Sequence, residues 1–329
     1  MVWYSLHAMV IFMTKKQWQP NASLETLRAR AAWIQHIRHF FNQRGYLEVE
    51  TPILSHHGIT DVYLRNITAH CLGQTGYLQT SPEYHMKRLL AAGSGPIFQI
   101  SKVFRDDELG RWHNPEFTML EWYQLDWDHH QLMEEVGQLL DSVLSCGPLQ
   151  KYIYRDLFIQ VCGCDPFLAS IQELQTLLNQ YQLDNVLAAD EPDKDQYLFL
   201  LMTHVIEPAI AKLPNPVAVY GFPVSQAALA QIDKGQASRF EVYYRGVELA
   251  NGFHELTDPQ LQRDRFESDQ QQRRAAGFPS MDIDPRFIQA LAAGLPPCSG
   301  VALGLDRLLV FACQAQRISE VLSFDWHNA

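Results

Sequence analysis

The sequence is poor in features that mark secreted, membrane-spanning or zinc-binding proteins. Its 329 residues contain six cysteines, and the closest two, Cys162 and Cys164, lack the two-residue spacer of zinc and redox pairs. No apolar run approaches the ~20 residues that a membrane helix needs. We therefore expect reduced thiols, no membrane association and a cytoplasmic location.

The first residues, MVWYSLHAMVIFMTKK, are apolar and only then basic. A secretory signal peptide has its positive charges before its apolar run, so this order argues against one. We interpret residues 1–19 as an extension without a functional role, followed by a single domain over residues 20–329.

Positive charge is also scarce. Lys and Arg total 26 against 37 Asp and Glu, which gives a formal net charge of -11. A surface with this balance does not attract nucleic acid as a whole, although it leaves room for a local basic patch. The balance weighs against RNA as a partner.

Common loops for nucleotides and metals are absent as well. Gly93-Ser94-Gly95 begins like a dinucleotide loop, but Phe98 stands where the third glycine is required, and no P-loop occurs. The pair His254-Glu255 lacks the second histidine of a zinc-protease helix. A nucleotide, if one binds, must be held in another way.

What is present predicts an α+β fold with mainly antiparallel, hairpin-connected strands. A long amphipathic helix follows Ser23, a suitable N-cap, and stops near Gly45. An edge strand then runs to Pro52, and a strand, a turn and a helix follow over residues 76–93.

Two hairpins and several helices complete the predicted domain. Segments 96–105 and 115–123 pair as one hairpin, and segment 239–253 forms another that turns at Arg245-Gly246. Further elements are helices around residues 128–145, 170–182 and 194–212, and a strand that enters a helix over 300–315.

Two acids on the second hairpin favour a divalent cation. A two-residue turn would place Glu248 opposite Tyr243, so Glu241 and Glu248 would share one face of the sheet. Like charges in this arrangement repel each other unless a cation lies between them. Mg²⁺ carrying nucleotide phosphates would supply that charge, and a solvated strand face is the alternative.

Other charged residues are ambiguous when each is taken alone. The planar guanidinium groups of Arg105 and Arg307 suit a phosphate or nucleotide, but a surface ion pair is their ordinary role. Glu83 is placed to favour a helix N-terminus, and Glu255 follows an Asn-Gly break as either a surface acid or a ligand group. Only the combination of these residues is specific.

In chain order, these segments resemble the three signature motifs of class II aminoacyl-tRNA synthetases. A long helix and a strand ending at Pro52 come first, then FR, a loop and HNPEFTMLEWY, and finally GVALGLDRL. The similarity is closest to the catalytic core of lysyl-tRNA synthetase, over residues 20–326, and includes the string ELANGFHEL. It implies a class II synthetase-like antiparallel sheet flanked by helices.

The resemblance implies a role for each candidate residue. Arg105 would hold the α-phosphate of ATP, and Phe117 and Arg307 would sandwich adenine. The ATP site would comprise Arg105, Asp107, Asn114, Phe117, Glu248, Leu249, Gly304 and Arg307, with Arg105 and Arg307 as catalytic residues. Glu241 and Glu248 would share Mg²⁺. The amino acid would be bound by Ser81, Glu83, Tyr123, Glu255 and Ala302, with support from Glu121.

The implied chemistry is in-line attack of a lysine carboxylate on the α-phosphorus of ATP, which yields an aminoacyl adenylate and pyrophosphate. Within the pocket, Glu255 and Tyr123 would receive the side-chain ammonium, and Glu83 would face the other amine. Such chemistry depends mainly on positioning and charge stabilisation, to which arginines and Mg²⁺ are suited.

Three positions depart from the lysyl-tRNA synthetase pattern. Ser81 stands where alanine is usual, Ala302 replaces the middle glycine of the third motif, and Asp107 stands where glutamate is frequent. In addition, only about twenty residues precede the first helix, too few for the five strands of an anticodon-binding OB barrel. We therefore expect no anticodon-binding domain.

These departures resemble the elongation factor P lysine ligase family, which transfers (R)-β-lysine, in preference to α-lysine, to a lysine of elongation factor P. The resemblance implies ATP and Mg²⁺, elongation factor P instead of tRNA as partner, and a homodimer formed through the first motif. Two alternatives stay open: a truncated lysyl-tRNA synthetase that charges tRNA, and a non-catalytic lysine- and ATP-binding regulator. The regulator is the weaker alternative, because the nucleotide arginines and Mg²⁺ acids are retained.

Overall fold

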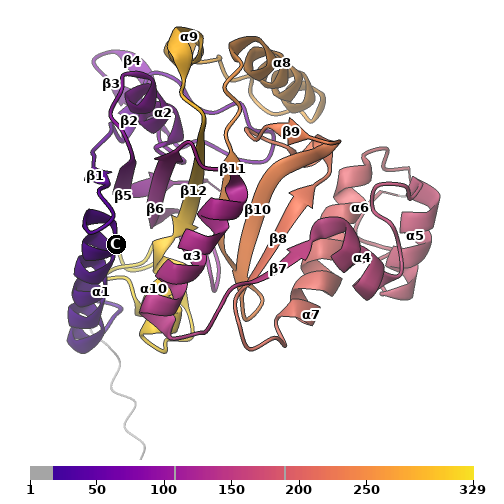
Figure 1. The fold of residues 1–329 in the computed structure, drawn as a ribbon, viewed down its shortest axis with the longest axis horizontal. Coiled ribbons are helices and arrows are strands. Elements are labelled where there is room, and N and C mark those ends of the chain that lie inside the picture. Colours follow the sequence, from indigo (N-terminus) through magenta and orange to yellow (C-terminus); the bar gives the residue numbers. More distant parts are fainter. Residues whose placement is uncertain (1–17, 107–108, 189) are drawn as a thin grey trace, which may run out of the picture.

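A large mixed sheet forms the centre of the protein, and a small antiparallel sheet stands beside it (Figure 1). The computed structural model describes residues 18–106, 109–188 and 190–329. In spatial order, the large sheet consists of β1 (Leu47–Glu48), β5 (Ile97–Phe104), β6 (Glu116–Leu125), β12 (Cys298–Gly304), β11 (Val247–His254), β10 (Gln236–Tyr244), β8 (Val217–Phe222) and β7 (Gln150–Ile153), with β9 (Ile232–Asp233) paired to β10. The small sheet has the order β2 (Leu54–Ser55), β4 (Gln74–Leu78) and β3 (Thr68–Cys71).

All pairings in the large sheet are antiparallel except the outermost two, β1 with β5 and β7 with β8. The α+β fold predicted from the sequence is therefore confirmed. The helices around the sheets are α1 (Leu24–Asn42), α2 (Glu83–Ala91), α3 (His129–Leu144), α4 (Tyr154–Cys162), α5 (Ile171–Gln180), α6 (Lys194–Leu201), α7 (Glu207–Ile210), α8 (Pro259–Ala275), α9 (Pro285–Gly294) and α10 (Leu305–Ala312).

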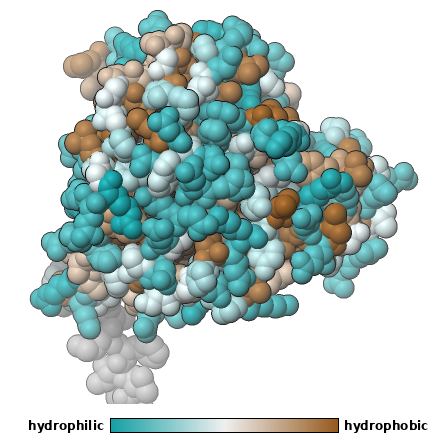
Figure 2. Space-filling model, viewed as in Figure 1, coloured by the Kyte–Doolittle hydropathy of each residue, from teal (hydrophilic) through white to brown (hydrophobic). Residues whose placement is uncertain are grey.

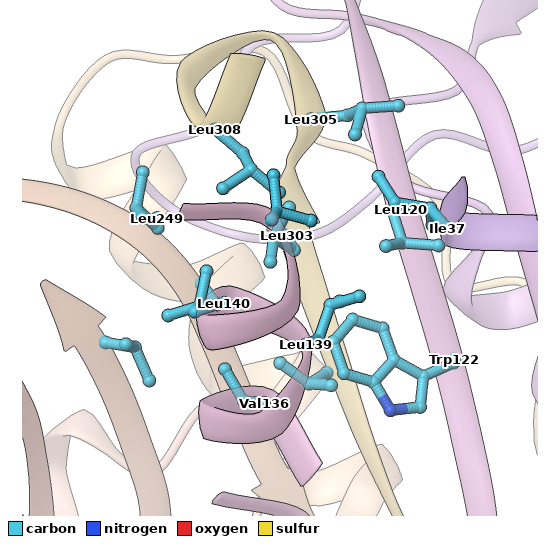
Figure 3. Packing of buried hydrophobic residues seen from close by; sticks show 14 of the residues in the cluster. Ile37, Leu120, Trp122, Val136, Leu139, Leu140, Leu249, Leu303, Leu305 and Leu308 are labelled. Carbon is cyan, nitrogen blue, oxygen red and sulfur yellow. The ribbon is translucent and has the colours of Figure 1, made fainter. Parts of the chain in front are cut away.

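One hydrophobic core holds α1, α3 and α10 on the central strands (Figure 3). Trp122 and Leu120 of β6 and Leu303 of β12 are fully buried there, beside Leu139 of α3 and Ile37 of α1. Burying a side chain of this size stabilises the fold by roughly 1.5–3 kcal/mol. The central strands, which carry most candidate site residues, are therefore held rigidly.

A second core joins α4, α5 and α6 to β8 and the end of β10. This helical region lies at the side of the sheet opposite to α1 (Figure 1). The face of the molecule seen in Figure 2 is mostly hydrophilic, with only small, separated hydrophobic patches. Within the described ranges, no helix combines the length and the apolar character needed to cross a membrane.

The helices with clear signals lie where the sequence predicts them. Ser23 caps α1 by accepting a hydrogen bond from the Thr26 amide at 3.0 Å, and Gly45 takes a left-handed φ of 78° just beyond the helix. The helix predicted over residues 194–212 is interrupted, because a π-helical turn at Met202–Ile206 separates α6 from α7. Helices α4, α8 and α9 were not predicted.

Candidate active site

The candidate residues for the amino acid converge on Glu121, in the middle of β6. Tyr123 Oη donates a hydrogen bond to Glu121 Oε1 at 2.6 Å, and Ser81 Oγ donates to Glu121 Oε2 at 2.8 Å. Ala302 of β12 is the direct cross-strand partner of Glu121, so the two side chains share a face. Ser81 and Ala302, the two departures from the synthetase pattern, therefore meet at one carboxylate.

Ser81 also positions the next acidic residue. Its hydroxyl accepts a hydrogen bond from the Glu83 amide at 3.1 Å, at the start of α2. Burial, followed by the charge of Glu83, raises the pKa of the Glu121 carboxyl to about 7, although the bonds from Tyr123 and Ser81 oppose the shift. A cationic ligand beside Glu121 would favour its ionised form.

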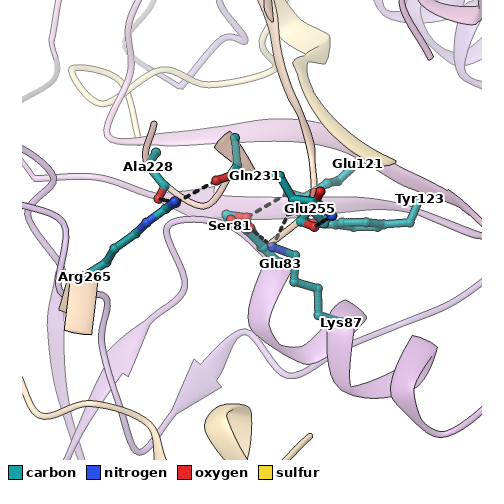
Figure 4. A network of polar contacts seen from close by, with 10 residues as sticks. Ser81, Glu83, Lys87, Glu121, Tyr123, Ala228, Gln231, Glu255 and Arg265 are labelled. Carbon is teal, nitrogen blue, oxygen red and sulfur yellow. Dashed lines mark hydrogen bonds and ion pairs between the residues drawn. The ribbon is translucent and has the colours of Figure 1, made fainter. Parts of the chain in front are cut away.

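A buried lysine, which the sequence did not single out, joins the other two pocket acids. Lys87 Nζ lies 2.6 Å from Glu83 Oε1 and 2.5 Å from Glu255 Oε2 (Figure 4). Burial raises the pKa of the Glu255 carboxyl to about 8, and Lys87 opposes this rise. Burial alone would lower the pKa of Lys87, but Glu255 and Glu83 raise it above its usual value. We therefore treat Lys87 as an ammonium.

The glycine at the centre of β12 allows these side chains to come together. A Cβ atom on Gly300 would lie 2.2 Å from Tyr123 Cε1 and 2.6 Å from Glu255 Oε1. No larger residue fits at that position without moving the ring or the carboxylate. The third motif thus contributes space to the amino-acid pocket as well as a strand.

Residues 228–231, directly before β9, contact the main chain of Glu255 and the helix α8 (Figure 4). Gln231 Nε2 donates to the Glu255 carbonyl oxygen at 2.9 Å. Arg265 of α8 donates to the carbonyl oxygens of Ala228 and Ala230, each at 2.7 Å. Helix α8, which the sequence did not predict, therefore helps to fix the position of Glu255.

The candidate nucleotide residues lie at the beginning of β6 and around α10. The Arg105 guanidinium carbon lies 5.2 Å from the centre of the Phe117 ring. Arg307 donates to the carbonyl oxygens of Trp112 at 3.2 Å and Glu248 at 2.8 Å. These contacts hold the guanidinium of Arg307 between the loop before β6 and the strand β11.

Four further ATP candidates have different surroundings. The side-chain amide of Asn114 is bonded within the protein: its Nδ2 donates to the Glu116 carbonyl oxygen at 2.7 Å, and its Oδ1 accepts from the Trp326 amide at 2.9 Å. Leu249 is buried in the core of Figure 3, so a nucleotide could contact only its main chain. Gly304 ends β12 directly before α10. Asp107 lies outside the described residues.

The acidic hairpin has the predicted turn, with left-handed φ values of 51° at Arg245 and 76° at Gly246. Glu248 lies opposite Tyr243 as expected, but an irregularity between Val242 and Tyr243 shifts the register beyond it. Within the protein, Glu241 already accepts hydrogen bonds from Arg239 and from Tyr243. Arg239 is a cation that the sequence analysis did not identify.

A divalent cation is compatible with this acidic hairpin. The Glu248 side chain is 41% exposed, so desolvation is only partial; desolvation and then the charge of Glu241 raise its pKa, while Arg307 lowers it. Burial and the charges of Glu248 and Glu241 also raise the pKa of Glu207, on α7, to about 8. Carboxylate oxygens are the ligands that Mg²⁺ prefers, and each oxygen can accept more than one partner. No cluster of three or more possible metal ligands occurs in the described part of the chain, so most of the coordination would come from phosphate oxygens and water.

Asp306 links all three motif segments and was also missed. Its Oδ1 lies 2.6 Å from Arg30 Nη1 of α1, and its Oδ2 accepts a hydrogen bond from the Thr118 amide of β6 at 2.6 Å. The Asp306 side chain is buried. The available signal was an aspartate in the largely apolar segment GLDRLLVF, because an acid that is buried in such a segment ordinarily has a partner.

Comparison with known proteins agrees with this arrangement. The family model described as tRNA synthetases class II (D, K and N) matches residues 16–327. Proteins named Elongation factor P--(R)-beta-lysine ligase are 52% identical in Pasteurella multocida (strain Pm70) and 51% identical in Haemophilus influenzae (strain PittGG). The first alignment covers 96% of this chain and 99% of the relative, and the second covers 95% and 98%. The relative with the same name in Salmonella typhi is 50% identical over 93% of this chain and 97% of its own length. The chain belongs to the elongation factor P--(R)-beta-lysine ligase family, within the class II tRNA synthetases.

Proposed function

We propose that this protein is a ligase that activates (R)-β-lysine with ATP and transfers it to a lysine side chain of elongation factor P. The observation that carries the proposal is a cluster of three acids with one ammonium: Glu83 and Glu255 pair with Lys87, and Ser81 links Glu121 to the start of the helix that carries Glu83. When the three carboxylates are ionised, the cluster can pair with the two ammonium groups of a diamino acid. The name of the relatives supports elongation factor P as the acceptor.

ATP would bind across the start of β6 and α10. Arg105 would contact the α-phosphate, Phe117 and Arg307 would enclose adenine, and Gly304 and Asp107 would contribute to the same site. Glu241 and Glu248 would hold Mg²⁺, which neutralises phosphate charge when bound. The two arginines suit this role because their planar groups bind phosphate and stack on rings.

In the first step, a carboxylate oxygen of the amino acid attacks the α-phosphorus, and the bond to pyrophosphate breaks. In the second step, the neutral ε-amine of the acceptor lysine attacks the adenylate carbonyl, an amide bond forms, and AMP leaves with the bonding electrons. Free lysine has a pKa of about 10.4, so docking must favour the neutral amine by desolvation or a nearby charge.

Discrimination between β- and α-lysine would reside at Glu121. The Ser81 hydroxyl fixes one of its oxygens, and the Ala302 methyl occupies the neighbouring cross-strand position. A methylene-sized change in a pocket alters selectivity by about 1–3 kcal/mol. Ser81 and Ala302 together would therefore favour a substrate whose amine lies one carbon farther from the carboxylate.

We further propose that residues 20–329 act as one catalytic domain in a cytoplasmic homodimer, and that tRNA is not the acceptor. A competition assay tests the function. The protein receives Mg-ATP and labelled β-lysine or α-lysine, with lysine tRNA and elongation factor P present together. We expect label on elongation factor P, measured by intact mass, and more label with β-lysine.

Label on acid-precipitable RNA instead would identify a truncated lysyl-tRNA synthetase. Binding of ATP and lysine without any adenylate or transfer would identify a regulator. The variant Arg307→Ala should lose adenylate formation, measured by pyrophosphate exchange; a variant as active as the unmodified protein would contradict the assignment of the ATP site.

A further inference from the structure

Lys87 occupies an unusual position for a lysine. Its side chain has 0% exposure, and its Nζ lies 6.0 Å from the centre of the Phe287 ring of α9. A buried ammonium is costly unless it is paired, and here both partners are residues of the proposed amino-acid pocket, Glu83 and Glu255. The residue therefore combines a structural cost with direct contact to two substrate-binding groups.

The charges of the cluster can be counted from its members. When ionised, Glu83, Glu121 and Glu255 carry three negative charges, and Lys87 carries one positive charge, which leaves two negative charges uncompensated. A diamino acid brings two ammonium groups, and its own carboxylate is directed to ATP in the proposed reaction, so the two ammonium groups neutralise the cluster. An amino acid with a single amine would leave one buried carboxylate without a counter-charge, which is unfavourable.

We propose that Lys87 is a positioning residue that sets the charge of the pocket and thereby selects a diamino acid. Its ammonium holds Glu83 and Glu255 at fixed separation and neutralises one carboxylate, so that two, rather than three, substrate charges are required. This inference rests on the proposed function, because it takes the diamino acid to bind between these carboxylates.

Loss of the Lys87 charge would require a proton to replace it. The titratable groups that interact with Lys87 are Glu83 of α2, Glu121 of β6, Glu255 after β11, and Cys298 of β12, and Tyr123 of β6 bonds Glu121. Helix α9 contributes the uncharged ring of Phe287. Among these groups, a carboxylate would take up the proton, so substrate binding by the variant would become easier at low pH.

The test is Lys87→Met, which keeps an unbranched side chain out to the ε position and removes the ammonium group. We expect the KM for the diamino acid in pyrophosphate exchange to rise by about tenfold or more, because one partner of a buried charge pair is missing. The KM for ATP should remain unchanged. The ratio of the variant's amino-acid KM to that of the unmodified protein should shrink as the pH is lowered from about 8.5 to about 6.

Lys151→Met is the matched control, because Lys151 forms an ion pair with Glu134 at 2.5 Å away from the pocket residues. It should leave both KM values unchanged. An amino-acid KM for Lys87→Met equal to that of the unmodified protein, a KM ratio independent of pH, or an equal rise in the KM for ATP would overturn the inference.

Lys87→Arg keeps the positive charge and carries the test if Lys87→Met does not fold, as judged by circular dichroism. Its amino-acid KM should change with pH in the same direction as that of the unmodified protein, and the opposite direction would overturn the inference. The two proposals fail differently. If the unmodified protein forms no adenylate with a diamino acid, the proposed function is wrong. If it is active but Lys87→Met leaves the amino-acid KM unchanged, only this inference is wrong.

Discussion

Glu121 and Glu255 are buried carboxylates that the protein only partly neutralises. Tyr123 and Ser81 donate to both oxygens of Glu121, and Lys87 pairs with Glu255. Glu121 has hydrogen bonds but no direct counter-charge, and Glu255 shares the Lys87 ammonium with Glu83, so each acid retains a tendency to hold a proton. A bound ammonium group removes that tendency, and substrate binding is thereby linked to proton release.

This linkage predicts the pH dependence of amino-acid binding. Burial raises the pKa of Glu121 to about 7 and that of Glu255 to about 8, so below these values a proton must leave before an ammonium can pair. Affinity for the diamino acid should increase as the pH rises from about 6 to about 8.5 and then level off. The measurement is the amino-acid KM at a series of pH values. A KM that falls as the pH is lowered would contradict this assignment, and Glu121→Gln should remove the part of the rise near neutral pH.

A second prediction concerns the stabilising role of the buried Asp306. Asp306→Asn removes the carboxylate that pairs with the Arg30 guanidinium at 2.6 Å, in a place where the Asp306 side chain is only 1% exposed, and leaves Arg30 with neutral partners. Breaking a buried ion pair in this way costs about 3–5 kcal/mol, which urea unfolding can measure. The control is Glu48→Gln, which breaks a more exposed α1 pair, Arg38 with Glu48 at 2.9 Å, and should cost no more than about 1 kcal/mol. Equal losses for the two variants would show that Asp306 does not join the motifs as we describe.

At the scale of elements, the sequence predicted what depends on local chemistry. The Ser23 cap, the turn at Arg245-Gly246 and the pairing of Glu248 with Tyr243 all follow from neighbours in the chain. The register shift at Val242 was not predictable, because the extra residue in β11 is Leu249, an ordinary strand residue, and no glycine marks the bulge. Helix α8 was missed for another reason: two of its buried residues, Gln262 and Arg273, are polar, so its sequence has no regular apolar stripe.

The same division applies to the candidate site. Ser81, Glu83, Tyr123 and Glu255 came from motif resemblance, and the structure brings them together around Glu121 and Lys87. Lys87 itself was not identified, because a lysine four residues after a glutamate on a helix is ordinarily a surface pair. Only the tertiary structure reveals that this pair is buried and shared with Glu255. The roles of these residues in binding the amino acid, and those of the ATP candidates, stay predictions.

The turn of the acidic hairpin supplies an element-scale prediction. A Cβ at Gly246 would lie 2.8 Å from Ala211 Cβ, whereas a Cβ at Gly235, with a similar φ of 77°, would meet nothing within 4 Å. Both substitutions to alanine impose a left-handed φ, at about 1–2 kcal/mol, but only Gly246→Ala adds a clash, worth about 1–3 kcal/mol more. Urea unfolding of the two variants separates strain from packing. Equal destabilisation would mean that the turn does not pack on the segment after α7 as the structure has it.

At the scale of the whole molecule, two edge strands expose apolar side chains: Leu47 of β1 is 54% exposed and Leu54 of β2 is 39% exposed. Strand β1 is the outermost strand of the large sheet, beside α1 (Figure 1). An apolar, unpaired sheet edge is a surface that a second chain commonly covers. Together with the first motif, this edge supports the predicted homodimer.

We predict a mass in solution of twice the 37.8 kDa of the chain, and a shift to the single-chain mass in the double variant Leu47→Asp/Leu54→Asp. Light scattering after size exclusion measures both. Leu168→Asp is the control, because Leu168 is 77% exposed but lies between α4 and α5, at the other side of the sheet, and should leave the mass unchanged. Helix α1 belongs to the first motif, through which we expect the dimer to form, and its Arg30 bonds Thr118 of β6 and Asp306 of α10. Separation of the chains should disturb these contacts and thereby also reduce adenylate formation. A monomeric unmodified protein would contradict the dimer, and a fully active monomeric variant would show that the edge does not support the active site.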